Sequence, residues 1–231
     1  SDELPIHSVT LASFEMMRSE ITVGQYRLCV NASVCSSPST SSSYCNWSSS
    51  AGSKEDHPIN CIDWGQARTF AVWAEGDLPT EAQWEYANRA GTQTVYWGGN
   101  TIAEMRGRLN ISDRVARERG SPSSWKFEPE LDDGYTVHAP IGRFLPNNFG
   151  LHDTAGNVWE WCLDRFGAYT LPTSIGDGMR LVDVLEERYT FRGGGFRASS
   201  VHARSADRYS IYARDYSAYD VGIRPARALN P

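Results

Sequence analysis

The chain has 231 residues, a hydrophobic content of 40 % and a formal net charge of −6, which together fit one globular domain with elaborated loops. This charge argues against a nucleic-acid partner, because neutralising phosphates takes a clustered basic face. No run of eighteen apolar residues exists and the start of the chain lacks the pattern of a signal peptide. We therefore expect no membrane insertion by this segment and no targeting signal in it, with cell surface and cytoplasm both open as locations.

The first third of the chain predicts strands followed by helices. Residues 6–18 alternate enough for strands, and residues 20–30 carry apolar side chains at helical spacing. Asp63 is a suitable N-cap for a helix over residues 64–74. Thr80 and the glutamine three residues later form a capping-box pattern, which is the strongest helix signal in the chain.

Residues 91–146 form a long turn-rich region. It offers only two short strand candidates, over residues 94–97 and 136–139. Loops of that length are usually functional or held in place by ligands. We therefore expect a bound ion or a binding role in this part of the chain.

Four of the five cysteines surround a Ser-rich insertion over residues 33–56. Cys29, Cys35 and Cys45 bracket it and Cys61 follows closely. The insertion has too little apolar surface to hold itself together, so one or two disulfides there would suit an oxidising compartment. Spacing does not give their connectivity, and free or buried thiols are the alternative. Zinc is disfavoured because no paired CxxC motif or suitably spaced histidines accompany the cysteines.

The last 41 residues, from Phe191 to Pro231, have an unusual composition. They contain no Lys, Glu, Gln, Trp or Met, although these types make up 32 of the preceding 190 residues, so roughly seven would be expected. A codon ending in C or T encodes none of the five types. Tyrosines among small polar residues also give binding loops large contact area at little entropic cost. We interpret this segment as a diversified binding surface; the alternative is a surface loop with biased residue usage.

Six motifs follow one another in order along the chain: EITVGQYRLCV, HPINCIDWGQARTFAVW, LPTEAQWEYANRAG, NNFGLHDTAGNVWEWCLD, RGGGFRASS and GIRPAR. Together they resemble the formylglycine-generating enzyme family, also called the sulfatase-modifying-factor domain. The resemblance covers almost the whole chain and implies a single domain over residues 1–231. It also implies an α+β, C-type-lectin-like fold that is loop-rich, with small antiparallel sheets and two main helices.

The resemblance does not extend to the family's oxidase chemistry. Members that make formylglycine use two cysteines just after the RGGS motif to bind copper, and thiolate is the soft ligand that suits Cu(I). The matching positions hold Ala198 and, allowing a gap, a residue near Ser200, and no cysteine follows Cys162. We therefore expect no copper and no enzyme activity. The five histidines also lack the clustering that the iron-dependent sulfoxide synthases of the same fold need.

The calcium positions of the family are better matched. Carboxylate, amide and backbone oxygens are the ligands that Ca²⁺ prefers, and the resemblance implies one or two structural Ca²⁺ ions that hold the long loop region. The alternative is that these carboxylates only accept hydrogen bonds from turns. The matching residues of the first site are Asn110, Ile111, Asp133 and Tyr135. Those of the second site are Asp153, Gly156, Val158 and Glu160.

A non-catalytic branch matches the C-terminal segment. Variable proteins of bacterial diversity-generating retroelements resemble this family in fold, and a reverse transcriptase edits their genes between the RGG and GFR-AR motifs. This implies a variable ligand-binding region over residues 192–227, in which repeated arginines hold the fold through charge-assisted bonds. Residues 198–202, Asp207, 209–212 and 215–221 would face outward. The ligand-binding candidates are Ala198, Ser199, Val201, His202, Asp207, Tyr209, Ser210, Tyr212, Asp215, Tyr216, Ser217, Tyr219, Asp220 and Val221.

The expected function is therefore that of a non-catalytic ligand-binding protein, with an unknown protein or surface ligand as partner. One alternative is a formylglycine-generating-type oxidase. Another is a sensor module of a larger regulatory protein such as a kinase, with this chain fused to a further domain.

Overall fold

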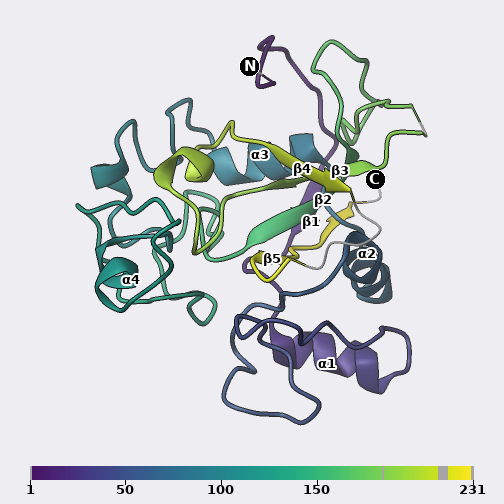
Figure 1. The fold of residues 1–231 in the computed structure, drawn as a ribbon. Helices are drawn as coiled ribbons and strands as arrows, with labels where there is room; N and C mark the ends of the chain where they lie inside the picture. The colour runs from purple at the N-terminus through teal and green to yellow at the C-terminus, as the bar shows by residue number, and fades with distance from the viewer. Residues whose placement is uncertain (1, 184, 213–217, 230–231) are drawn as a thin grey trace.

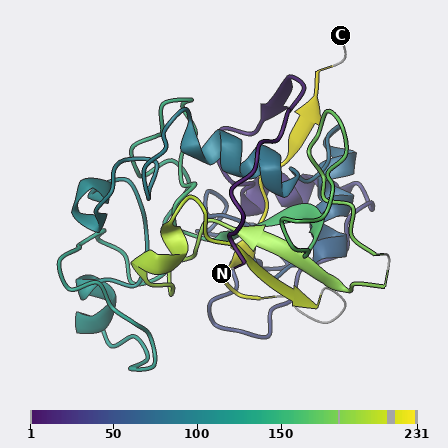
Figure 2. The same ribbon diagram turned by 90° about the horizontal axis from the view of Figure 1, so that it is seen from above.

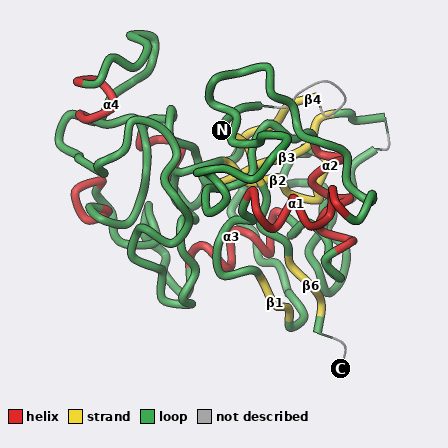
Figure 3. The backbone as a smooth tube through the Cα atoms, turned by 90° about the horizontal axis from the view of Figure 1, so that it is seen from below, coloured by secondary structure: helices red, strands yellow, loops and turns green. Residues whose placement is uncertain are grey.

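A four-stranded sheet and a two-stranded sheet organise an α+β fold in which loops make up much of the chain (Figure 1, Figure 3). This computed structural model describes residues 2–183, 185–212 and 218–229. The helices are α1 (Val23–Asn31), α2 (Trp64–Trp73), α3 (Glu81–Arg89) and α4 (Arg114–Glu118), with the 3-10 helices η1 (Ile102–Met105) and η2 (Ser200–Ala203). The strands are β1 (Phe14–Met16), β2 (Trp159–Arg165), β3 (Arg188–Arg192), β4 (Tyr209–Tyr212), β5 (Val221–Gly222) and β6 (Ala226–Ala228).

The helices α1, α2 and α3 each begin at a complete capping box. The side chain of the cap residue accepts a hydrogen bond from the backbone three residues on, and the glutamine there bonds back. The caps at Asp63 and Thr80 confirm the predicted starts of α2 and α3. α1 starts after Thr22, because the hydroxyl of that residue caps it. α1 has nine residues, as many as α3, so the fold has three main helices and not two.

The four-stranded sheet has the order β4-β3-β2-β5. The β2–β3 and β3–β4 pairs are antiparallel, but β5 runs parallel to β2. β4 and β5 lie at opposite edges of the sheet, and both run in the direction of β2. The parallel β2–β5 pair departs from the antiparallel sheets that were expected.

Helices cover both faces of this sheet. On one face, α3 places Trp84 against β2, where the indole nitrogen donates to the Glu160 carboxylate at 2.6 Å. On the opposite face, the Trp64 ring of α2 stacks on Tyr189 of β3 with ring centroids 4.0 Å apart. Successive side chains of a strand point to opposite faces, so Phe191 lies on the α2 face and packs against Trp159 and Trp161.

Fewer strands form than the sequence predicts. Within residues 6–18 only β1 is a strand, and residues 94–97 contribute an isolated bridge at Tyr96. The N-terminal segment passes across α3 before it reaches β1 (Figure 2). Together with that helix it lines a cavity. A strand needs a neighbouring strand to pair its backbone N–H and C=O groups. The alternation of apolar and polar residues over residues 6–18 was therefore not enough to predict strands. Residues 136–139 form no strand.

Two disulfides hold the Ser-rich insertion. Cys29 pairs with Cys35 and Cys45 pairs with Cys61, which settles the connectivity that spacing left open. None of the helices in the part of the chain that the structure describes has the length and apolar character that crossing a bilayer requires.

Candidate functional site

Buried arginines fasten the C-terminal segment to the rest of the fold. Arg208 donates two hydrogen bonds to the Glu81 carboxylate of α3, at 2.8 and 2.6 Å. Arg224 contacts both carboxylate oxygens of Glu160 at 2.7–3.1 Å. Arg192 donates to the carboxylate of Glu85, which lies one turn after Glu81 in α3, and to the Ala206 carbonyl. Charge-assisted bonds are about twice as strong as neutral ones, so these contacts confirm the expected scaffold role of the arginines.

A cavity of about 610 Å³ opens on the face of the four-stranded sheet opposite α3. We call it the sheet-face pocket. Its lining comes from β2, β3, β4 and β5, from the segment around η2, and from the loop over residues 122–126. Ligand pockets in proteins typically measure about 300–1,000 Å³, so this cavity has room for a side chain or a small ligand.

The loop that closes the sheet-face pocket is fixed by hydrogen bonds to η2. The Glu128 carboxylate accepts from the Ser200 backbone N–H at 3.0 Å and from its hydroxyl at 2.5 Å. The backbone N–H of Glu128 donates to Ser112 O, and the N–H of Ser112 donates to Ala198 O. These bonds hold the loop over residues 122–126 in place against the segment around η2.

Aromatic rings form the pocket wall on the sheet side. Trp159 lies at the centre of this group, with its ring centroid 5.1 Å from Phe191, 5.5 Å from His202 and 5.9 Å from Tyr209. We call these four rings the sheet-side cluster. Rings at these separations stabilise one another beyond their burial, which makes this wall rigid.

A second group of rings lies on the loop side. Phe196 has Tyr44, Trp125 and Tyr219 around it, with ring centroids at 5.8, 5.8 and 6.4 Å. Trp125 and Tyr219 line the pocket. We call these four rings the loop-side cluster, so that the pocket has aromatic surface on two sides.

The charged side chains that line the described pocket are few. Arg197 pairs with Asp220 at 2.5 Å and its guanidinium lies 4.8 Å from the ring of Tyr219. Lys126 is exposed at the rim. Asp220 is the one acidic residue among those that line the pocket in the described ranges, and it is 2 % exposed.

Strand β4 has one face toward the pocket and one away from it. Tyr209 and Ile211 line the pocket, whereas Ser210 and Tyr212, which alternate with them, do not. Tyr209 and Tyr212 are both well exposed, at 50 % and 63 %. Two tyrosines that look equivalent in the sequence thus have different surroundings.

The structure brings half of the predicted ligand-binding residues together in this pocket. Those that line it are Ala198, Ser199, His202, Tyr209, Tyr219, Asp220 and Val221. Val201, Ser210 and Tyr212 lie elsewhere on the surface. Asp215, Tyr216 and Ser217 lie outside the described residues.

The prediction that the whole set faces outward is wrong at five of the described positions. Ala198, Asp207, Ala218, Asp220 and Val221 are buried. Asp207 is buried because its carboxylate pairs with Arg204 at 3.0 Å and with His202 at 3.1 Å. Burying a charge requires such a partner. The partner of Asp220 is Arg197. Ala198 and Val221 belong to the hydrophobic core under the pocket.

Sequence reasoning missed several lining residues. They are Pro122, Ser124, Trp125, Lys126, Trp159, Phe191 and Arg197. Ile211 was expected to face outward but was not among the ligand-binding candidates. Trp125 and Lys126 lie in the long loop region over residues 91–146. The length of that region was the only feature of the sequence that indicated a binding role for it. Nothing local in the sequence indicates that this loop returns to η2.

The first predicted calcium site is occupied by hydrogen bonds within the chain. The Asp133 carboxylate accepts from the backbone N–H groups of Ile111 at 3.1 Å and Tyr135 at 2.8 Å, and the Asn110 side chain donates to Val137 O. Burial, aided by the nearby Asp113, raises the pKa of Asp133 to about 8. A buried carboxyl with so high a pKa fits a position that a cation would neutralise.

The second predicted site fits a cation less well. Asp153 accepts from Gly142 N at 2.6 Å and its other oxygen has no partner, while burial raises the pKa of its carboxyl. Both oxygens of Glu160, however, are engaged by Arg224. The backbone of Val158 donates to buried Glu20, and burial raises the pKa of that carboxyl as well. A cation here would compete with the guanidinium for Glu160.

No group of three or more His, Cys, Asp or Glu side chains able to hold a metal occurs among the residues placed in the structure. Backbone and amide oxygens, which Ca²⁺ also uses, fall outside that set. The predicted calcium sites therefore remain predictions.

Cys162 is the free cysteine of the chain and is buried. Burial raises the pKa of its thiol well above the usual range, so it is held as a thiol and not as the reactive thiolate.

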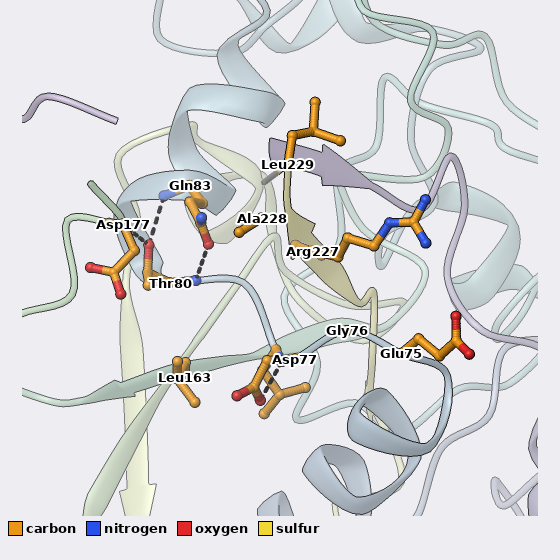
Figure 4. Close-up of a pocket in the computed structure, with 12 residues that line it drawn as sticks. Glu75, Gly76, Asp77, Thr80, Gln83, Leu163, Asp177, Arg227, Ala228 and Leu229 are labelled. Atoms are coloured by element: carbon orange, nitrogen blue, oxygen red, sulfur yellow. Dashed lines mark hydrogen bonds between the residues drawn. The ribbon is translucent and has the colours of Figure 1, made fainter. Parts of the chain in front are cut away.

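A separate cavity of about 680 Å³ lies between the α2–α3 connection and β6 (Figure 4). Its polar groups are occupied by local structure: Thr80 and Gln83 bond to each other as the cap of α3, and Asp77 caps Leu78 N. It contains none of the predicted ligand-binding residues.

The structure is a loop-rich α+β domain with a pocket lined largely by its C-terminal segment. The sulfatase-modifying factor enzyme 1-like domain matches residues 1–229, and the chain belongs to this family. The formylglycine-generating enzyme of Thermomonospora curvata is 36 % identical over 188 residues, covering 77 % of this chain and 58 % of the relative. The chain thus spans a little over half the length of that relative.

Two further similarities show the range of the family. A Bos taurus protein named inactive C-alpha-formylglycine-generating enzyme 2 is 31 % identical over 135 residues, covering 58 % of this chain and 41 % of that protein. The structure of Treponema denticola variable protein 1 superimposes with a TM-score of 0.71 at 20 % identity, covering 96 % of this chain and 87 % of that one. This confirms the formylglycine-generating-enzyme-type fold.

Proposed function

We propose that this chain is a non-catalytic ligand-binding protein whose C-terminal segment forms a diversified binding surface, like the variable proteins of diversity-generating retroelements. The observation that carries the proposal is that most of the described lining of the sheet-face pocket comes from the C-terminal segment. Of the fifteen lining residues that the structure describes, ten come from residues 191–221, inside the segment that lacks Lys, Glu, Gln, Trp and Met. The partner would be a protein or another surface ligand.

The scaffold arginines explain how such a surface tolerates change. Arg192, Arg208 and Arg224 are buried and bonded to carboxylates of α3 and β2. Between them lie exposed side chains such as Val201 and Tyr212. A fixed backbone lowers the ordering cost of binding, so side-chain changes can alter partner choice without unfolding the domain.

The thiols support a function other than formylglycine formation. Four of the five cysteines are in disulfides and Cys162 is buried, so the chain offers no accessible thiol pair as a soft copper ligand or redox nucleophile. With a cysteine-containing peptide, copper and oxygen, we expect no oxygen consumption beyond that of a heat-inactivated sample. The Thermomonospora curvata enzyme is the positive control, and turnover comparable to it would overturn the proposal.

Calcium enters the proposal as a structural ion. Asp133, Asn110 and the backbone carbonyls of Ile111 and Tyr135 would hold it, and the ion would supply positive charge to a buried carboxyl.

The decisive experiment is deep sequencing of the 3′ end of the gene across cells and related isolates. We expect substitutions at exposed or pocket positions such as Ser199, Val201, Tyr209 and Tyr212, with Arg208 and the other scaffold arginine codons unchanged. The codons for residues 147–190 provide the internal baseline. If residues 191–231 vary as little as that baseline, the protein has a single specificity and the interpretation as a diversified binding surface is wrong.

A further inference from the structure

We infer that the sheet-face pocket takes an aromatic side chain of a protein ligand that has a carboxylate beside it. This inference rests on the proposed function and specifies its chemistry for this variant. It follows from the shape of the pocket, from its charges and from the polar groups that it lacks.

The aromatic surfaces determine the shape of the group that fits. The sheet-side cluster presents Tyr209 and Trp159, and the loop-side cluster presents Trp125 and Tyr219. Offset-stacked and edge-to-face contacts between rings favour a flat aromatic group between such surfaces. Because both clusters are packed internally, the pocket is preorganised and a ring entering it orders few protein side chains.

The charges determine what lies beside that ring. The cationic groups that line the described pocket are Lys126, exposed at the rim, and Arg197. Asp220 is the acidic group, and it is buried in its pair with Arg197. The accessible charge of the rim is therefore positive. Opposite charges across an interface favour encounter and orientation, so a carboxylate flanking the aromatic group complements this rim.

The same residues disfavour a saccharide. Sugar hydroxyl groups need both donors and acceptors, and amide or carboxylate side chains commonly provide them. No Asn, Gln or Glu lines the described part of the pocket, and Asp220 already accepts from Arg197. A sugar ring would stack on Trp159 or Tyr209, but its hydroxyl groups would find only serine and tyrosine hydroxyls and the His202 ring as neutral partners, without amide or free carboxylate side chains.

The test uses four defined probes and isothermal titration calorimetry. Three are capped pentapeptides, Gly-Asp-Trp-Asp-Gly, Gly-Lys-Trp-Lys-Gly and Gly-Asp-Ala-Asp-Gly, and the fourth is chitotriose. We expect the acidic tryptophan peptide to bind at least about tenfold more tightly than each of the others, and its affinity to fall as salt screens the rim charge.

Matched variants locate the binding. Tyr209→Ala removes pocket surface and should weaken the acidic tryptophan peptide by about tenfold. Tyr86→Ala removes a comparably exposed tyrosine from α3, outside the pocket and outside the C-terminal segment, and should leave the affinity unchanged. Lys126→Glu should abolish the preference for the acidic over the basic tryptophan peptide. Melting temperatures of all variants verify folding.

Several outcomes would overturn the inference: equal binding of acidic and basic peptides, equal effects of Tyr209→Ala and Tyr86→Ala, tighter binding of chitotriose, or no binding of any peptide. None of them bears on the sequencing of the gene's 3′ end. A gene that varies while the peptides fail to bind would keep the proposed function and reject this ligand chemistry.

Discussion

Arg224 and Glu160 form an ion pair that is buried on both sides, with two guanidinium nitrogens 2.7–3.1 Å from the carboxylate oxygens. The pair joins the end of the C-terminal segment to the central strand β2. Arg224 also donates to the carbonyls of Met17 and His152. One side chain thus connects four parts of the chain.

Arg224→Met should lower the free energy of unfolding by about 3–5 kcal/mol, because it leaves the Glu160 carboxylate buried without its partner. Urea denaturation measures this change. Arg227→Met is the matched control: Arg227 pairs with Glu15, but both side chains are more than half exposed, so its loss should cost at most about 1 kcal/mol. Equal effects of the two variants would contradict the scaffold role of Arg224.

The sequence predicted the local parts of the fold well. The caps at Asp63 and Thr80 were recognisable because every residue of a capping box lies within one turn. The central sheet was not, because its strands are short and their partners distant: Trp159 of β2 pairs with Val221 of β5. Such pairings depend on the whole chain and leave no local pattern.

The candidate site divides in the same way. Composition directed attention to the correct segment, but burial within it depends on contacts elsewhere. Asp207 and Asp220 look like surface residues in the sequence and are buried because arginines pair with them. Lys126 lies in the pocket only because Glu128 bonds to Ser200, a contact that spacing does not reveal.

The two disulfides should differ in their contribution to stability. In the loop-entropy description, the stabilisation grows with the length of chain enclosed. The Cys45–Cys61 bond spans 16 residues and the Cys29–Cys35 bond spans 6, which corresponds to about 3 and about 2 kcal/mol. Replacing each pair by serines and measuring urea denaturation tests the order. A larger loss from the Cys29/Cys35 pair would show that packing around α1, and not chain entropy, dominates.

Calcium should stabilise the folded protein if Asp133 is a ligand. Ligands that bind only the folded state raise the melting temperature, so we expect a lower melting temperature in EGTA than in millimolar Ca²⁺. Asp133→Asn should remove most of that difference. Asp132→Asn alters the neighbouring carboxylate, which is about half exposed, and should preserve the difference. A melting temperature that is the same with and without Ca²⁺ would reject the predicted site.

His57 and His138 should make stability fall in acid. Their Nδ1 atoms lie 3.0 Å apart, so one ring donates to the other and both cannot be protonated there. Burial lowers the pKa of His138 to about 3. It also lowers the pKa of His57, where Lys54 and Arg143 act in the same direction and Asp56 opposes them.

The folded protein therefore keeps His138 neutral, whereas the unfolded chain takes up a proton below about pH 6.5. The unfolded state binds more protons between about pH 6.5 and 3, so the free energy of unfolding decreases as the pH falls through that window. His138→Gln removes this proton uptake and should flatten the pH dependence measured by urea denaturation. His7→Gln changes an exposed histidine and should leave the slope as in the original protein. If His138→Gln shows the full slope, other groups cause the acid sensitivity and the histidine pair contributes only packing, through its contact with Phe196.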